Sequence, residues 1–392
     1  MAHNAIIIHG GAPTAVLNAS LYGTVRELMN SGELGTVYGA GGGMKGILSG
    51  NFINLSGLEK DTLEKLPYTP ASAIGTSRDP IEPEAYAKIV EILNNSGIRY
   101  VFLNGGNGTM DTAGKICRTP GSEKLRVLGI PKTIDNDIAV TDHSPGYGSA
   151  ARYIASVVRE IVLDVQALPI HICIVEAMGR NAGWITAASS LAGDDSGSGP
   201  DLICVPEIPF DEDRFLEEAS ALYRQKGYAV VVVSEGLKKK DGSPIVAPIF
   251  TIGRSVYYGD TGTYLAGLIV KKLGIKSRSE KPGILGRVSS AYQSETDRSE
   301  AIAAGAEAAR SALAGKSGVM VGFQRDAGEA YSCRMKLIPF EEVMAFEKVL
   351  PGEFISPDGK GVTKAFRHWC RPLIGSKLTE YVRLENRPGT RS

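Results

Sequence analysis

The feature that most constrains the fold is a repeated alternation of short apolar runs, turns rich in glycine or charge, and helical stretches. Residues 5–9, 100–103 and 170–176 are apolar runs with the length of buried strands. Helical patterns follow the first two runs at 15–30 and 110–117. Strands that alternate with helices are joined by crossover connections, which place the strands parallel in one sheet and the helices on its faces. The sequence therefore predicts a doubly wound α/β fold.

The alternation restarts near residue 165, which predicts two lobes rather than one continuous sheet. We expect Rossmann-like α/β lobes at residues 1–165 and 166–320, and a C-terminal segment, 321–392, that packs back on the body. In open parallel sheets, ligands bind outside the carboxyl ends of the strands. The functional site is therefore expected in the cleft between the two lobes.

The charge balance and the cysteines limit the class of partner. The chain has 43 basic and 43 acidic side chains, so its formal net charge is zero. Binders of nucleic acid or of membrane surfaces usually carry a basic excess, so neither partner is expected. Five scattered cysteines without paired spacing favour reduced thiols over disulfides or a metal cluster. We expect no membrane helix and no signal peptide, and hence a cytoplasmic protein.

The densest group of reactive side chains follows a short apolar run that ends at residue 130. Pro131 ends the ladder of hydrogen bonds because it has no N–H. Lys132, Thr133, Asp135 and Asp137 follow within six residues. A carboxylate beside a lysine is suited to deprotonating an alcohol that attacks a phosphoryl group. The competing interpretation is a solvated turn, since Asp and Asn are common in loops.

Two glycine-rich turns are expected at the same sheet edge. Gly10 and Gly11 follow the first apolar run, and the 105–109 turn follows a later one. Such turns leave backbone N–H groups and a helix N-terminus free to bind an anion, although glycine often serves close packing alone. Arg78 and Arg180, each beside a small-residue turn, could bind phosphate or carboxylate. Together with the charged stretch, these turns predict a polyphosphate site.

Taken together, these motifs resemble the phosphofructokinase family. The landmarks occur in the order and spacing of that family over most of the chain, and the pairing of Thr-Ile-Asp-Asn-Asp with Met-Gly-Arg is specific to it. The pattern is similar to the branch of longer chains, which includes many pyrophosphate-dependent members. The landmarks are Gly10-Gly11, the 105–109 turn, Pro131 to Asp137, Met178-Gly179-Arg180, Glu235 and residues 282–287.

The resemblance implies glycolytic conversion of fructose 6-phosphate to fructose 1,6-bisphosphate, with Mg²⁺ as cofactor and ATP or pyrophosphate as donor. It implies donor phosphates on the first lobe, the sugar phosphate on the second, and a homodimer or homotetramer. Asp135 would be the general base for the sugar 1-hydroxyl, with Lys132, Thr133 and Asp137 beside it. The implied donor-binding residues are Gly11, Arg78, Gly106, Gly108 and Thr109. The implied sugar-binding residues are Thr133, Asp135, Met178, Gly179, Arg180, Glu235, Arg278 and Arg287.

Three positions depart from the family pattern. Asn107, the implied residue at the metal, stands where many members carry an aspartate. Asparagine offers an oxygen without a charge, so Mg²⁺ would depend more on donor phosphates and water. Gly286 replaces the glutamine that commonly precedes Arg287, so one sugar contact is lost. His171 stands where bacterial ATP enzymes have an arginine that reaches a neighbouring subunit, and we interpret it as a packed strand histidine.

Gly108 and Lys132 indicate different donors. Pyrophosphate enzymes of this family usually have an aspartate at the first position, where it fills and repels the space for the α-phosphate of ATP, and a lysine at the second. Gly108 leaves that space open, whereas Lys132 is the pyrophosphate-type residue. A blocked site excludes ATP and an added lysine does not. ATP is therefore favoured over pyrophosphate.

Other classes of protein are also compatible with parts of the sequence. Asn107 and Gly286 leave open a non-catalytic sugar-phosphate sensor on the same scaffold. A lipid or NAD kinase shares a similar glycine turn but should lack the Met-Gly-Arg segment and the second lobe. A dehydrogenase is disfavoured because no Gly-x-Gly-x-x-Gly follows the first strand.

Overall fold

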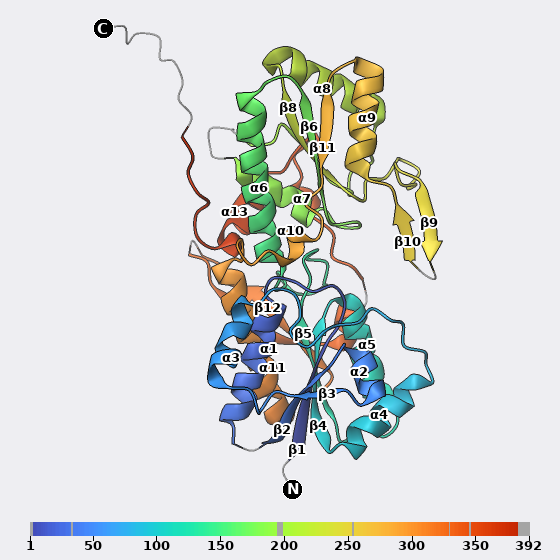
Figure 1. Ribbon diagram of the computed structural model, residues 1–392, viewed down its shortest axis with the longest axis vertical. Coiled ribbons are helices and arrows are strands. Elements are labelled where there is room, and N and C mark those ends of the chain that lie inside the picture. The colour runs from blue at the N-terminus through green and yellow to red at the C-terminus, as the bar shows by residue number, and fades with distance from the viewer. Residues whose placement is uncertain are drawn as a thin grey trace, which may run out of the picture.

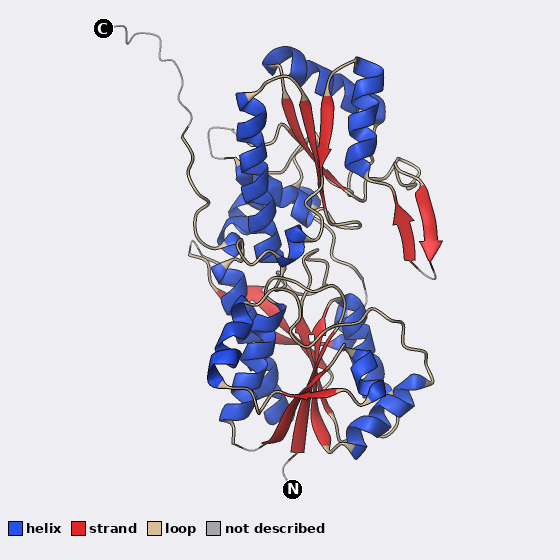
Figure 2. Ribbon diagram, viewed as in Figure 1, coloured by secondary structure: helices blue, strands red, loops and turns tan. Residues whose placement is uncertain are grey.

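The computed structural model describes residues 3–32, 34–193, 199–252, 255–328, 330–344 and 346–382. Two α/β units lie end to end along the long axis of the molecule, with the N-terminus at the far end of the lower one (Figure 1). Each unit has a sheet between layers of helices (Figure 2). The predicted two-lobe, doubly wound architecture is confirmed.

The sheet of the lower unit has seven strands, in the spatial order β13 (Cys333–Pro339), β12 (Val319–Arg325), β5 (Arg126–Pro131), β4 (Ile98–Gly105), β1 (His3–His9), β2 (Leu34–Ala40) and β3 (Phe52–Asn54). The five inner strands are parallel, and β3 and β13 are antiparallel edges. Strand β2, the next in the chain, pairs with one side of β1, and β4 pairs with the other side. The topological switch point, where ligands bind in such sheets, therefore lies between β1 and β4.

Helices cover both faces of this sheet (Figure 1). One face carries α1 (Leu17–Asn30), α3 (Lys60–Lys65), the 3₁₀ helix η1 (Leu66–Tyr68) and α11 (Glu295–Leu313). The other carries α2 (Met44–Ser49), α4 (Ala85–Asn95), α5 (Asn107–Arg118) and α12 (Phe340–Val343). Helices α1 and α11 approach closely, because a Cβ on Gly23 would collide with the carbonyl of Ile302 and one on Gly305 with that of Ser20.

The sheet of the upper unit has four parallel strands, in the order β11 (Ser277–Glu280), β6 (Ile172–Ala177), β8 (Ala229–Ser234) and β7 (Leu202–Cys204). One face packs on α6 (Tyr147–Ala167), α7 (Trp184–Ala188), η2 (Ser189–Ala192), α13 (Lys364–Cys370) and η4 (Arg371–Ile374). The other face packs on α8 (Glu212–Lys226) and α9 (Thr261–Leu273). A hairpin of β9 (Pro248–Ile252) and β10 (Ser255–Tyr258) projects at the side (Figure 1). The short α10 (Leu285–Val288) and η3 (Gly352–Phe354) complete the elements.

The predicted lobe bounds, 1–165 and 166–320, do not follow the two sheets. Helix α6 begins before residue 165, yet it packs in the core of the upper unit. Helix α11 and the start of β12 lie within 166–320, yet they belong to the lower unit, because α11 packs on α1 and β12 pairs with β5. The predicted bounds need this correction because the lower unit consists of two separate stretches of chain.

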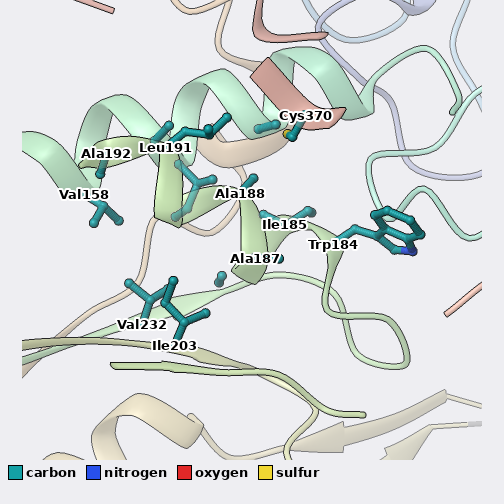
Figure 3. Packing of buried hydrophobic residues seen from close by; sticks show 14 of the residues in the cluster. Val158, Trp184, Ile185, Ala187, Ala188, Leu191, Ala192, Ile203, Val232 and Cys370 are labelled. Carbon is teal, nitrogen blue, oxygen red and sulfur yellow. The ribbon is translucent and has the colours of Figure 1, made fainter. Parts of the chain in front are cut away.

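The C-terminal segment contributes to both units. Residues 333–339 form the edge strand of the lower sheet. Further along, Cys370 of α13 lies in the core of the upper unit with Trp184, Leu191 and Val232 (Figure 3). All five cysteines are free thiols. None of the helices in the described part of the chain has the length and apolarity needed to cross a bilayer.

Candidate active site

Strand β5 brings the charged stretch to the carboxyl edge of the lower sheet. The Thr133 hydroxyl donates a hydrogen bond to Oδ1 of Asp137 (2.9 Å) and accepts one from the N–H of Asp135 (3.0 Å). Between these carboxylates, Asn136 has a φ of 53°, in the left-handed region that asparagine tolerates. The loop is therefore folded on itself so that both aspartates face one cavity.

That cavity has a volume of about 650 Å³ and lies where β1, β4 and β5 end. Because parallel strands end at one edge of the sheet, their loops meet there, and Arg287 reaches the cavity from the upper unit. The cavity therefore lies between the units. The predicted site residues that line it are Gly11, Arg78, Gly106, Asn107, Gly108, Thr109, Lys132, Thr133, Asp135, Asp137 and Arg287.

The two glycine turns pack against each other at the carboxyl ends of β1 and β4. A Cβ on Gly10 or on Gly105 would collide with the side chain of Thr109. Gly11 has a φ of 78°, which favours glycine. Gly106 directly precedes α5, and its carbonyl accepts the N–H groups of Thr109 (2.9 Å) and Met110 (3.1 Å). The N–H groups that lie before Thr109 are therefore the ones at the helix N-terminus that could face an anion. The turns thus form a surface suited to phosphate.

The space beside Gly108 is open. A Cβ placed on this residue would meet no atom within 4 Å. Gly108 lies in the first turn of α5 and lines the cavity. A larger side chain would therefore extend into solvent or into the cavity without disturbing the helix.

Four basic side chains line the cavity: Arg78, Lys132, Arg287 and Lys115, of which Lys115 forms an ion pair with Asp111. Nζ of Lys132 donates a hydrogen bond to the carbonyl of Ala12, at 2.6 Å. Burial, together with the charge of Arg78, lowers the pKa of Lys132 to about 8, although Asp135 opposes the shift. Among the described residues, Nε of Arg287 is buried and has no hydrogen-bond partner. An anionic ligand would satisfy this group and relieve the repulsion between the cations.

Asp135 is the carboxyl with the most altered acidity in the cavity. Burial raises its pKa to about 7, and the negative charges of Asp137, Glu235 and Glu347 add to the shift, while Lys132 opposes it. A carboxyl with a pKa near neutrality can accept a proton and return it at physiological pH. Such displaced values are common at functional sites.

The residues around Asn107 fit a hard cation. Its Nδ2 donates hydrogen bonds to the carbonyl oxygen (3.3 Å) and to Oδ2 (3.0 Å) of Asp137. These bonds identify Oδ1 as the free oxygen, which is buried and has no partner among the described residues. Amide and carboxylate oxygens are the ligands that Mg²⁺ prefers, so Asn107 and Asp137 could hold it together with donor phosphates.

The remaining predicted residues lie outside the cavity lining. The N–H of Gly179 donates to Oε1 of Glu235 (3.4 Å), and the guanidinium of Arg180 lies 5.2 Å from the ring centroid of Tyr258. Met178 lines a small apolar space behind the charged loop. These residues follow β6 and β8 at the facing edge of the upper sheet.

Arg278 lies apart from this group. It lines a separate cavity of about 390 Å³ on α6 and β11, together with His171. His171 is buried at the start of β6. The structure therefore does not bring Arg278 together with Arg287.

Glu347 lines the main cavity and is absent from the predicted set. Its Oε2 accepts a hydrogen bond from Nδ2 of Asn181 (3.0 Å), and its backbone forms an antiparallel bridge with Ile138. Glu347 lies in an irregular stretch between α12 and η3, far from every glycine turn in the sequence. The only signal for Glu347 in the sequence is its place beside Lys348, and a pair of adjacent charged residues is a weak indication of a functional site.

Known proteins resemble this chain over nearly its whole length. The family model Phosphofructokinase matches residues 4–312. Pyrophosphate–fructose 6-phosphate 1-phosphotransferase of Halomonas elongata is 35% identical over 95% of this chain and 92% of its own. Sulfofructose kinase of Alkalicoccus urumqiensis is 31% identical and covers 93% of each chain. The crystal structure of pyrophosphate-dependent phosphofructokinase from Nitrosospira multiformis is 32% identical, with a TM-score of 0.89 over 98% of this chain and 95% of that one. With this fold and this cavity, the chain belongs to the phosphofructokinase family and is a phosphotransferase.

Proposed function

We propose that the protein transfers a phosphoryl group from ATP to the 1-hydroxyl of fructose 6-phosphate. The observation that carries the proposal is Asp135, a carboxyl with a pKa of about 7 that lines a cavity together with Arg78, Lys132 and Arg287. As the hydroxyl attacks the γ-phosphorus, Asp135 accepts its proton, the new O–P bond forms, and the bond from the γ-phosphorus to the bridging oxygen breaks so that ADP leaves. Positioning and charge neutralisation supply most of the catalysis in such reactions.

The donor phosphates would lie on the glycine turns. Gly106 and Gly108 would offer backbone N–H groups and Arg78 a planar cation, with Gly11 and Thr109 shaping the surface. The N–H groups of Gly11 and Thr109 are already used, because they donate to the carbonyls of Ser77 (3.0 Å) and Gly106 (2.9 Å). Nζ of Lys132 donates to the carbonyl of Ala12 in the first glycine turn, and Lys132 lines the same cavity as Asp135, so its ammonium would neutralise charge on the group in transfer. Asn107 and Asp137 would hold Mg²⁺, which neutralises charge on the donor phosphates when it is bound.

The sugar phosphate would lie toward the upper unit. Arg287, whose Nε lacks a partner among the described residues, would bind the 6-phosphate. Met178, Gly179, Arg180 and Glu235 would contact the sugar from the ends of β6 and β8. Arg278 would take part only if its cavity faces a second subunit, since it lies apart from Arg287.

Pyrophosphate is the second candidate donor, and specific observations favour it. Lys132 is the lysine of the pyrophosphate-type pattern, and the Halomonas elongata relative is named for this donor. The open space at Gly108 favours ATP. Steady-state turnover of fructose 6-phosphate with Mg²⁺, with ATP and pyrophosphate side by side, tests the proposal. We expect higher kcat/KM with ATP. Turnover with pyrophosphate alone would reject ATP, and a folded protein that binds the sugar phosphate without turnover would be a sensor.

The neutral variant Glu347→Gln should move the pH profile of the reaction. The charge of Glu347 contributes to the raised pKa of Asp135, so its removal lowers that pKa and ionises the base at lower pH. We expect the rising limb of kcat/KM, centred near pH 7 in the wild type, to shift about 0.5 unit toward acid. A profile measured from pH 5 to 9 checks this. Glu341→Gln, on the exposed face of α12, is the control and should leave the limb in place.

A further inference from the structure

Residues 346–350, which we name the strap, connect the two units at the cavity that Glu347 lines. On the lower side, the N–H of Lys348 donates to the carbonyl of Asp137, at 2.8 Å. On the upper side, the N–H of Leu350 donates to Oε1 of Glu207, at 2.8 Å. The same carboxylate oxygen accepts the N–H of Gly183, also at 2.8 Å. The strap is therefore hydrogen-bonded both to the charged loop and to the turn that precedes α7.

The side chain of Lys348 makes a second set of contacts across the same boundary. Its Nζ donates to the carbonyls of Thr141 (2.9 Å) and Asp142 (2.8 Å), which continue the charged loop. The ammonium lies 5.1 Å from the ring centroid of Trp184, and the indole N–H of Trp184 donates to the carbonyl of Lys348, at 3.2 Å. Lys348 thus holds three carbonyls of the loop and one ring of the upper unit.

Burying the ammonium of Lys348 costs free energy of desolvation that an apolar side chain at this position would not. It lowers the pKa of Lys348 to about 7, and among the described residues no carboxylate lies within ion-pair distance of the ammonium. A methionine or leucine would fill the space without the cost of desolvating an amine. A lysine here supplies what those residues cannot, two directed hydrogen bonds to the backbone of the loop.

The loop that Lys348 holds is the one that carries the reactive groups. Asp137, whose carbonyl accepts the strap N–H, binds Thr133 through one carboxylate oxygen and Asn107 through the other. A shift of the Asp137 backbone would therefore move the base loop and the candidate cation ligand together. Displacements of about 1 Å in such an arrangement can lower the rate of reaction by about 100-fold.

We propose that Lys348 is a positioning residue, which holds the 133–142 loop against Trp184 and so sets the separation between the donor-binding and sugar-binding units. Lys348 does not line the cavity, so it acts through the loop and not on substrate. The inference rests on the proposed function for its kinetic readout, and a second readout is independent of any reaction.

The first test is Lys348→Met, which keeps the aliphatic stem over Trp184 and removes both side-chain hydrogen bonds. We expect kcat to fall about 30-fold, with KM for sugar phosphate and donor within about threefold of the wild type, because the binding groups remain in place. The matched control is Lys364→Met, an exposed lysine at the start of α13, which should leave both constants unchanged. A kcat within threefold of the wild type, or a loss confined to KM, would overturn the proposal.

Amide hydrogen exchange in the absence of substrates separates this inference from the proposed function. In Lys348→Met, peptides covering residues 133–142 should exchange at least tenfold faster, while those of β8 keep their wild-type rate. Unchanged exchange in the 133–142 loop would reject the positioning role of Lys348 even if the variant is inactive. If the wild type turns over neither donor, the function fails and the exchange result alone decides the inference.

Trp184→Phe provides a milder variant in case Lys348→Met does not fold. Phenylalanine keeps an aromatic ring near the ammonium and removes the indole N–H that binds the strap carbonyl. It is also smaller than the buried tryptophan, so some loss of stability is expected with it. We expect kcat to fall three- to fivefold in this variant. The kcat of the double variant should be no lower than that of Lys348→Met alone, because both substitutions act on the same contact between Lys348 and Trp184. If the two losses in kcat multiply in the double variant, the effects are independent and the two residues do not act together.

Discussion

Replacing Asp135 with asparagine should abolish turnover and at the same time stabilise the fold. Asparagine is nearly isosteric with aspartate, so the loop bond from its backbone N–H to Thr133 remains. It cannot accept the proton of the sugar hydroxyl, and we expect kcat to fall by at least about 10³-fold. Steady-state kinetics with saturating donor and sugar phosphate measure the loss.

The gain in stability follows from the acidity of this carboxyl. Burial and its negative neighbours raise the pKa of Asp135 from the ordinary value of 3.8 to about 7 in the folded protein. Between these values the folded state binds more protons than the unfolded state, so stability falls as pH rises from about 4 to 7. Asparagine removes this penalty. One pKa unit corresponds to about 1.4 kcal/mol, and we expect the free energy of unfolding at pH 8 to rise by about 2–4 kcal/mol.

Denaturant unfolding of wild type and variant at pH 5 and pH 8 checks the sign. The difference between the two proteins should be clearly smaller at pH 5 than at pH 8, because most of the penalty accumulates as the pH rises from about 4 to 7, through the range in which only the folded carboxyl stays protonated. Asp61→Asn, an exposed aspartate in the first turn of α3, is the control and should show no such pH dependence. An active Asp135→Asn enzyme would remove Asp135 from the role of base. A variant less stable than the wild type at pH 8 would show that the carboxylate is favourably bound.

Local signals in the sequence were sufficient for the fold class and for the loops that line the main cavity. Each strand of the lower sheet that ends in a reactive loop is an apolar run followed by glycine or proline. The run and the glycine or proline are adjacent in the sequence, so the pattern can be recognised without knowledge of distant contacts. Because β1, β4 and β5 are parallel, their loops had to meet at one edge, which is why Gly11, Thr109 and Asp135 line one cavity. Topology alone was enough to bring them together.

The features that sequence reasoning missed depend on contacts between distant segments. Helix α11 lies in the lower unit because the small residues Gly23 and Gly305 let it pack on α1, and no local pattern reveals the partner of a helix. Glu347 lines the cavity from an irregular stretch, and Lys348 beside it binds backbone carbonyls of the 133–142 loop, which every sequence possesses. The separation of Arg278 from Arg287 likewise depends on how β11 and α10 pack against α6.

Placing an aspartate at residue 108 should remove the use of ATP while leaving pyrophosphate as a donor. The space beside Gly108 is open, and a carboxylate in the first turn of α5 interacts favourably with the helix dipole, so Gly108→Asp should fold normally. At about 5 Å and an effective dielectric constant of about 20, two unit charges repel by about 3 kcal/mol. We therefore expect kcat/KM for ATP to fall by more than about 100-fold.

Gly108→Asn separates charge from size in this experiment. Asparagine fills the same volume without a charge, so it should lower kcat/KM for ATP about tenfold or less, and neither variant should change the value for pyrophosphate by more than about threefold. Equal losses of kcat/KM for ATP in the two variants would show that the volume of the side chain, and not its charge, excludes ATP. ATP use that survives in Gly108→Asp would show that the α-phosphate does not lie beside α5. Since Lys132 is the same in all three proteins, a switch of donor at residue 108 would show that charge exclusion, and not the added lysine, selects the phosphoryl donor.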